Sequence, residues 1–200
     1  MKQKLIALIP FFALIMGFSG CGTTAQNDLM GAYNMTQCKY AYNSISNISV
    51  SGVNITSGSA LSPLNLAKLT TVLAGNPNSI PLNFTVNMNV TNPNQSAALL
   101  NKLQYAVSID DIHFTDGTLD QAVNIAGGAT QTIPLTVGVD VASLMKNNSQ
   151  SALLNIVKNI AGLSGEKSTV SLNLRPTFNI AGQPITSPIA FPVSFSFGGK

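Results

Sequence analysis

The stretch PLNFTVNMNVTNPNQ, residues 81–95, alternates apolar side chains with Asn and Thr from Leu82 to Thr91. A period of two of this kind predicts a β-strand that buries one face and exposes the other. The strand is expected to end at Asn92-Pro93-Asn94, because proline cannot donate to the next ladder position and asparagine readily bonds to the local backbone. The apolar face carries Leu82, Phe84, Val86, Met88 and Val90.

Turn residues divide the rest of the chain into further strands. Ser51-Gly52 interrupts an alternating stretch at 48–55 and predicts a kink or bulge there. Asp110-Asp111 separates two stretches of opposite parity, which predicts a tight hairpin. Asp116-Gly117 and Gly127-Gly128 mark two later turns. Six or more such strands predict an antiparallel β-sandwich, because each strand buries only one face.

Two segments repeat apolar residues at helical spacing instead. The first, residues 63–75, has Ser62 as its N-cap and Pro63 as its first residue, and the second spans residues 150–162. We expect two short amphipathic helices, which either cap the open ends of the sandwich or line an apolar groove for an acyl chain or a partner helix. The expected core includes Phe84, Val86, Met88, Tyr105, Val107, Val137, Val139, Phe191 and Phe195.

The N-terminus has the layout of a secretory signal peptide. Lys2 and Lys4 precede an apolar run that ends in small residues before Cys21. The run is shorter than the roughly 20 apolar residues that a membrane-spanning helix needs. The letters FSGC resemble a bacterial lipobox, in which the cysteine is acylated and begins the mature chain. We therefore predict a lipoprotein signal peptide at 1–20 and lipidation of Cys21; the alternative is an ordinary signal peptide with a chance cysteine.

Charge and cysteine content narrow the function classes. The formal charge of +3 includes Lys2 and Lys4, so the mature chain carries eight basic residues against seven acidic ones. The mature part has no cluster of basic residues, which excludes the stripe that nucleic-acid binding requires. If Cys21 is acylated, Cys38 is left as a lone thiol, and its weakly charged neighbourhood predicts a small buried side chain.

Residues 21–36 show no sustained period and are expected to form a flexible tether. Fully extended, ~15 residues reach roughly 50 Å, so the folded part would stand clear of a bilayer. The remaining residues, 37–200, suit one domain, which we expect to be a monomer.

No set of residues assembles a convincing catalytic or metal site. His113 is the only histidine, and no G-x-S-x-G elbow accompanies it. Asp110, Asp111, Asp116 and Asp120 miss the spacing of a calcium-binding loop, which favours solvated turn residues. We therefore expect no catalytic residue, no metal and no cofactor, and the sequence assigns no ligand-binding residue.

The order of several short segments resembles a known family. NVTNPNQ, LQYAVSIDD, DGTL, GGATQTIPLTV, SALLNIVKNI and SPIAFPVSF together resemble the late embryogenesis abundant type 2 family, whose domain is also called the water-stress and hypersensitive-response domain. The resemblance spans residues 46–198. It implies an immunoglobulin-like or fibronectin-III-like sandwich, no catalysis, and an association with desiccation or stress protection.

These predictions describe a non-catalytic lipoprotein that binds or protects components of the cell envelope. Gly22 follows the cysteine where Asp would signal retention at the inner membrane, which favours the outer membrane of a Gram-negative bacterium. The expected partners are the membrane, through the lipid anchor, and a lipid or an envelope protein. The alternative function is a carrier or sensor of an apolar ligand such as a lipid, which needs an apolar cavity of a few hundred cubic ångströms beside helix 63–75 or helix 150–162.

Overall fold

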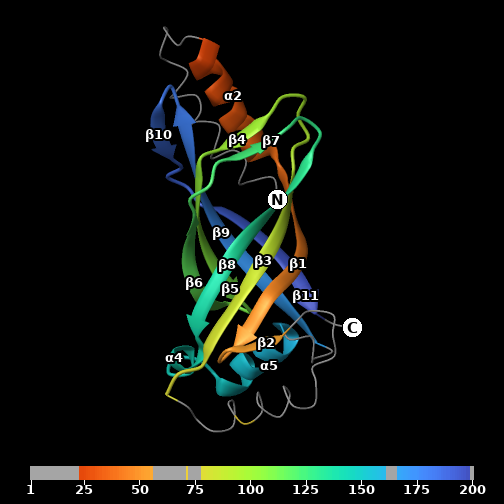
Figure 1. Ribbon diagram of the computed structural model, residues 1–200, viewed down its shortest axis with the longest axis vertical. Helices are drawn as coiled ribbons and strands as arrows, with labels where there is room; N and C mark the ends of the chain where they lie inside the picture. The colour runs from red at the N-terminus through yellow and green to blue at the C-terminus, as the bar shows by residue number, and fades with distance from the viewer. Residues whose placement is uncertain (1–22, 56–70, 72–77, 161–165, 199–200) are drawn as a thin grey trace.

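The computed structural model describes residues 23–55, 71, 78–160 and 166–198 (Figure 1). The predicted signal peptide lies outside the described residues, and so does the predicted helix at 63–75 apart from Thr71. In chain order the elements are α2 (Thr23–Gln37), β1 (Lys39–Val50), β2 (Val53–Ile55), β3 (Pro81–Thr91), β4 (Ala98–Leu100), β5 (Lys102–Ile109), β6 (Ile112–Leu119), β7 (Val123–Ile125), β8 (Thr130–Asp140), α4 (Val141–Leu144), α5 (Gln150–Ile160), β9 (Lys167–Ile180), β10 (Gln183–Thr186) and β11 (Phe191–Gly198).

Two antiparallel sheets enclose one apolar core. The first sheet has the strand order β2-β1-β3-β8, and the second has the order β10-β9-β5-β6, with β11 also pairing with β9. Strands β4 and β7 form a small third sheet beside α2, at one end of the molecule (Figure 1). The prediction of a mainly β, antiparallel sandwich is confirmed.

The 81–95 stretch forms β3, which lies in the middle of the first sheet between β1 and β8. Its predicted apolar face is buried, and none of those five side chains is more than 1% exposed. Across the core, the ring of Phe84 meets Phe114 of the second sheet in an edge-on arrangement with 6.5 Å between ring centroids. The predicted core residues Tyr105, Val107 and Val137 are buried as well.

Three of the predicted core residues are only half-buried. Val139 lies near the end of β8, while Phe191 and Phe195 lie on β11, which pairs with β9 alone. An edge strand has a neighbour on one side only, so its inward side chains keep part of their surface in solvent. Phe195 still packs on Tyr42 of the other sheet, with 5.2 Å between ring centroids.

Asn92-Pro93-Asn94 ends β3 as predicted, and its first residue is fully buried. The side-chain amide of Asn92 donates to the backbone carbonyls of Ser96 and Ile125, each at 2.9 Å. Its Oδ1 accepts the backbone N–H of Asn94 at 3.0 Å, which is the local bonding expected of asparagine in a turn. The bond to Ile125 is additional, and it joins the end of β3 to β7.

Two hairpins have two-residue turns in the left-handed conformation. Asp110 and Asp111, with φ of 49° and 64°, form the predicted turn between β5 and β6. Ser51 and Gly52, with φ of 47° and 78°, form an equivalent turn between β1 and β2. The predicted kink or bulge at Ser51-Gly52 is therefore wrong, because the chain reverses direction there and β2 pairs back on β1.

The segment predicted to be a flexible tether is also different in the structure. Residues 23–37 form α2, which packs against β4 and β9. The helix buries Ala25, Ala32 and Met35, and the Asn34 amide donates to Ser96 Oγ at 2.8 Å and to the Ala97 carbonyl at 2.9 Å. Small and polar residues make up much of this buried face, so the sequence shows no apolar period.

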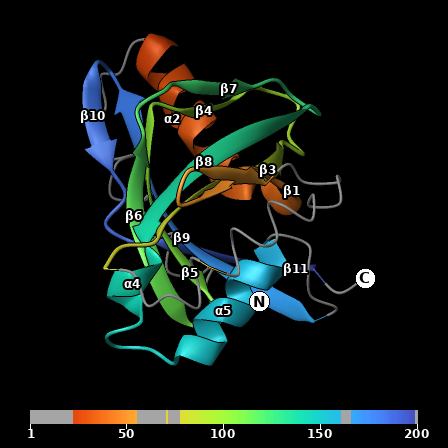
Figure 2. The same ribbon diagram turned by 60° about the horizontal axis from the view of Figure 1, so that its bottom comes forward.

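Helix α5 confirms the second predicted helix, at 150–162, as far as Ile160; positions 161 and 162 lie outside the described residues. It buries Leu153, Ile156, Val157 and Ile160 and contacts β9 and β11. In both views α5 and α4 lie at the end of the molecule opposite α2 (Figures 1 and 2).

Asp140 caps α4 and supplies a pH-dependent contribution to stability. Its carboxylate accepts the N–H of Ile80 at 2.8 Å and of Ala142 at 3.0 Å, and the Ser79 hydroxyl at 2.9 Å. These bonds, the Ile80 bond foremost, hold the pKa of Asp140 below its usual value of 3.8. A carboxylate with a lowered folded pKa stabilises the fold above its unfolded pKa, and this contribution disappears as the pH falls through the folded pKa.

Replacement of Asp140 by alanine is expected to lower the free energy of unfolding by about 1 kcal/mol at neutral pH, the usual cost of losing an N-cap. The difference from the unmodified protein should shrink as the pH falls below about 3.8 and then through the lowered folded pKa, because the carboxylate is protonated first in the unfolded and then in the folded state. Urea unfolding followed by circular dichroism across this range would measure it. A difference that is constant with pH would contradict the assigned role of the charge.

Candidate functional site

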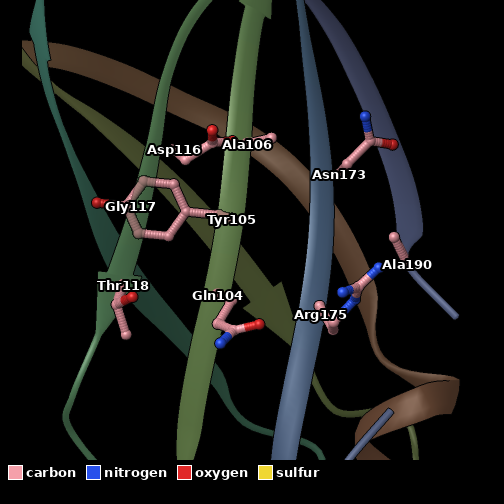
Figure 3. A pocket seen from close by; sticks show the side chains of 9 residues that line it. All are labelled: Gln104, Tyr105, Ala106, Asp116, Gly117, Thr118, Asn173, Arg175 and Ala190. Atoms are coloured by element: carbon pink, nitrogen blue, oxygen red, sulfur yellow. The ribbon is translucent and has the colours of Figure 1, made fainter. Parts of the chain in front are cut away.

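A cleft of about 410 Å³ opens along β5, β6 and β9 (Figure 3). The exposed side chains of Gln104 on β5 and Arg175 on β9 lie opposite each other in the ladder. Two residues further along β5, Ala106 pairs with Asn173. The cleft is lined by Gln104, Tyr105, Ala106, Asp116, Gly117, Thr118, Asn173, Arg175 and Ala190.

One side of the cleft is formed by the ring of Tyr105, which lies across Gly117 of β6 (Figure 3). A side chain at position 117 would overlap this ring, so glycine is required by the close approach. The predicted turn at Asp116-Gly117 is therefore wrong, because both residues lie inside β6. The glycine makes room for an aromatic neighbour and does not mark a chain reversal.

The Tyr105 hydroxyl is already bound within the protein. It donates to the carbonyl of Thr136 on β8 at 2.8 Å and so links β5 of the second sheet to the edge strand β8 of the first. Burial raises the pKa of this phenol, and the bond to Thr136 opposes the shift in part. Tyr105 is therefore a neutral, structural member of the cleft and not a proton donor for a ligand.

The cleft offers hydrogen-bonding groups, the positive charge of Arg175 and the negative charge of Asp116. The ion pairs among the described residues join Lys102 to Asp120 and His113 to Asp116, and neither involves Arg175. A guanidinium presents five N–H donors in a planar fork, and the amides of Gln104 and Asn173 can donate or accept. No hydroxyl or thiol in the lining stands beside a general base. This arrangement suits the binding of a polar group and gives no support for catalysis.

The aspartates considered in the sequence do not converge. Asp110 and Asp111 form the β5–β6 turn, and the carboxylate of Asp110 accepts the N–H of Thr169 at 2.7 Å. Asp116 lies 3.4 Å from the imidazole of His113, and both side chains are exposed. Within the described ranges, no three His, Cys, Asp or Glu side chains come together in a way that could hold a metal ion.

Of the two cysteines, the structure describes only Cys38. Cys21, the predicted lipidation site, lies outside the described residues. Cys38 is buried after α2, its thiol lies 3.4 Å from the carbonyl of Asn34, and burial raises its pKa to about 11. A thiol with so high a pKa is protonated at neutral pH and unreactive, which confirms the interpretation of Cys38 as a small buried side chain.

Apolar space in the described core is small. The cavity bounded by Met35, Met88, Leu103 and Phe191 has a volume of about 20 Å³, close to the space that one water molecule occupies. Cavities that hold a small ligand measure roughly 300 to 1,000 Å³. A more open cleft of about 260 Å³ lies between α2, β4, β7 and β9, with Asp28 and Asn101 among its lining residues.

Comparison with known families identifies the family of this chain. A family model described as late embryogenesis abundant protein matches residues 87–194, a region that runs from β3 to β11 and includes the whole cleft. The chain belongs to this family. The predicted resemblance is thereby confirmed, and the matched region is a stress-related late embryogenesis abundant domain.

Three solved structures are similar to this late embryogenesis abundant chain. A crystal structure of a protein from Archaeoglobus fulgidus is 12% identical, covers 80% of this chain and 98% of its own, and has a TM-score of 0.37. A solution structure of an Arabidopsis thaliana protein is 11% identical, with 60% and 72% covered and a TM-score of 0.41. A solution structure described as a late embryogenesis abundant (LEA) protein is 12% identical, with 84% and 75% covered and a TM-score of 0.36.

A search of curated proteins gave no match to the chain. Among the described helices, none has both the length and the apolar character that crossing a membrane would require.

The cleft residues Gln104, Asn173 and Arg175 were not predicted as site residues of this late embryogenesis abundant domain. Strand alternation indicates that they point away from the apolar face of their strands. It does not indicate that β5 and β9, which are far apart in the sequence, lie side by side. The pairing of the two strands is what brings the three side chains into one cleft.

Proposed function

We propose that this protein is a non-catalytic lipoprotein that uses its late embryogenesis abundant domain to bind or protect components of the cell envelope. In this proposal, Cys21 is acylated and holds the chain at the outer membrane of a Gram-negative bacterium. Two or three acyl chains at ~0.8 kcal/mol per buried methylene anchor a protein without any membrane-spanning helix.

The observation that carries the protective role is the uncharged outer face of the first sheet. Strands β1, β3 and β8 contain only two charged residues, Lys39 and Asp140, and these stand at the ends of their strands. Between them the face displays hydroxyls and amides that bond to one another across the strands. Asn89 Oδ1, for example, accepts from Thr132 at 2.8 Å and from Asn43 at 3.2 Å.

Such a face can exchange hydrogen bonds with water, sugars or peptide groups without recruiting counterions. Salt screens the attraction between exposed charges and weakens binding that depends on it, whereas hydrogen bonding by neutral groups is not screened in this way. Drying concentrates the salt around an envelope protein, so a neutral face keeps its capacity for binding where an ionic face loses it. The protective role is therefore supported by the chemistry of this face as well as by membership of the late embryogenesis abundant family.

The anchor is tested by replacing Cys21 with serine, which removes the sulfur that the lipid would occupy. We expect nearly all of the variant to move from the membrane pellet to the soluble fraction, and the mass of the mature N-terminus to lose its acyl groups. An unmodified Cys21 in the parent protein, or a Cys21→Ser protein that stays wholly in membranes, would contradict the proposal.

Protection is tested by drying cells of the source organism that lack the chain and counting the survivors after rehydration. Cells that carry the parent protein should survive better than cells without it, and Cys21→Ser should restore little. Thr132→Lys introduces a charge on the neutral face, on the edge strand β8, and should reduce survival, while Gln183→Lys on β10 is the matched control. Equal survival of all these strains would count against a protective role.

A further inference from the structure

The two most exposed large apolar side chains of the described residues lie together on α2. Met30 is 51% exposed and Tyr33 is 46% exposed, and the two are three positions apart, so they share one side of the helix. Gln26, four positions before Met30, continues the same exposed stripe. In a globular domain, two large apolar residues on one side of a helix normally face the core.

Contacts made by the rest of α2 fix the helix on the domain, so it cannot roll to bury this pair. Gly31 lies so close to Leu99 that a Cβ atom there would overlap the leucine side chain. The Asn34 amide donates to Ser96 and Ala97, and the Asp28 carboxylate accepts the N–H of Ala181 at 3.1 Å. Packing and hydrogen bonds therefore set which side of the helix faces outward.

The charge pattern of α2 suits a lipid headgroup region. Asp28 is the only charged residue of the helix, and its carboxylate is bound to the turn between β9 and β10. The outward stripe is thus neutral, and the first charge after it is Lys39, which is exposed. Methionine and tyrosine side chains bury apolar surface at a membrane interface, where the tyrosine hydroxyl also stays hydrated.

The position of α2 in the chain indicates that a lipid bilayer contacts this surface. Thr23 begins α2 only two residues after Cys21, and two residues span at most ~7 Å. This step rests on the proposed lipidation of Cys21. With that lipid in place, the start of α2 is held at the bilayer, and no extended tether separates the domain from it.

We infer that α2 lies against the bilayer surface, with Met30 and Tyr33 in the headgroup region. The lipid on Cys21 and the outward stripe then form one membrane contact, which orients the sandwich. Helix α5 and the β5–β6 turn point away from the membrane, because they lie at the other end of the molecule (Figures 1 and 2). The cleft along β5, β6 and β9 stays open to solvent.

The absence of tryptophan from the chain permits a direct test. Met30→Trp and His113→Trp each introduce a single fluorophore, the first on α2 and the second on β6, where position 113 pairs with Ser108 near the far end of β5. From Lys102 to Ile109, β5 alone spans about 23 Å. Each full-length lipidated variant is placed in vesicles of phosphatidylethanolamine and phosphatidylglycerol, with ordinary or brominated acyl chains. Brominated lipid should quench the tryptophan emission of Met30→Trp on the order of twofold, as expected for a helix seated in the interface, and leave His113→Trp unchanged.

The unmodified chain gives a second readout that needs no new side chain. Hydrogen peroxide should convert Met30 to its sulfoxide more slowly in the lipidated, vesicle-bound protein than in soluble Cys21→Ser. Protein that floats with the vesicles but shows neither quenching of Met30→Trp nor protection of Met30 would overturn the inference and leave the anchor intact. Protein that carries no lipid and fails to float would overturn the proposed anchor, and the inference with it.

Discussion

Replacing Phe84 by alanine should lower the free energy of unfolding by about 3 to 5 kcal/mol, the range for removing a buried aromatic ring. Phe84 lies at the centre of β3, is 1% exposed, and contacts the ring of Phe114 from the opposite sheet. Its removal therefore costs both burial and an aromatic contact that spans the core. Urea unfolding followed by far-ultraviolet circular dichroism measures the effect.

Asn83 is the matched control, because it precedes Phe84 on the same strand and its side chain is exposed. Asn83→Ala should change stability by less than about 0.5 kcal/mol, as is usual for a surface position. Equal losses for Phe84→Ala and Asn83→Ala would mean that the two faces of β3 are assigned the wrong way round.

The faces of the strands could be predicted because burial in a sheet alternates with a period of two. Leu82 to Val90, Leu103 to Ile109 and the Asp110-Asp111 hairpin follow from this local rule. Helix α5 follows from the equally local spacing of Leu153, Ile156, Val157 and Ile160. In each case the information lies within a dozen residues of the element it describes.

Two of the failed predictions have their cause in contacts between distant residues. Helix α2 is stable on the domain through Gly31 against Leu99 and Asn34 against Ser96, and neither pair is visible as an apolar period. Gly117 looks like a turn residue because glycine often is one, but its reason is the ring of Tyr105 on the next strand. A turn and a close approach by a neighbouring ring both favour glycine, so the sequence alone does not distinguish the two.

The candidate cleft escapes prediction for a related reason. Its polar residues are ordinary exposed strand positions when each strand is considered alone. Only the antiparallel pairing of β5 with β9 sets Gln104 opposite Arg175. Sequence alternation predicts the side to which each points, and the topology of the sheet decides which side chains meet.

Replacing Asn92 by alanine should destabilise the protein by about 2 to 4 kcal/mol, even though the change removes only a polar side chain. The Asn92 amide satisfies the carbonyls of Ser96 and Ile125, and its Oδ1 satisfies the N–H of Asn94. Alanine leaves these backbone groups without that partner at a position that is 0% exposed. A buried polar group that loses its hydrogen bond costs roughly 1 to 3 kcal/mol.

The effect of Asn92→Ala should also spread to α2, because the same turn holds the helix. Asn34 donates to Ser96 Oγ, and the Asn94 amide lies 3.4 Å from the Asn34 carbonyl. Amide hydrogen exchange within α2 is therefore expected to quicken in Asn92→Ala, whereas Asn89→Ala on the exposed face of β3 should leave it unchanged. Unaltered exchange in α2 together with a full loss of stability would place the role of Asn92 in the β3–β7 connection alone. Because a loosened α2 would also release Met30 and Tyr33 from their fixed orientation, Asn92 connects the stability of the sandwich to the surface that we assign to the membrane.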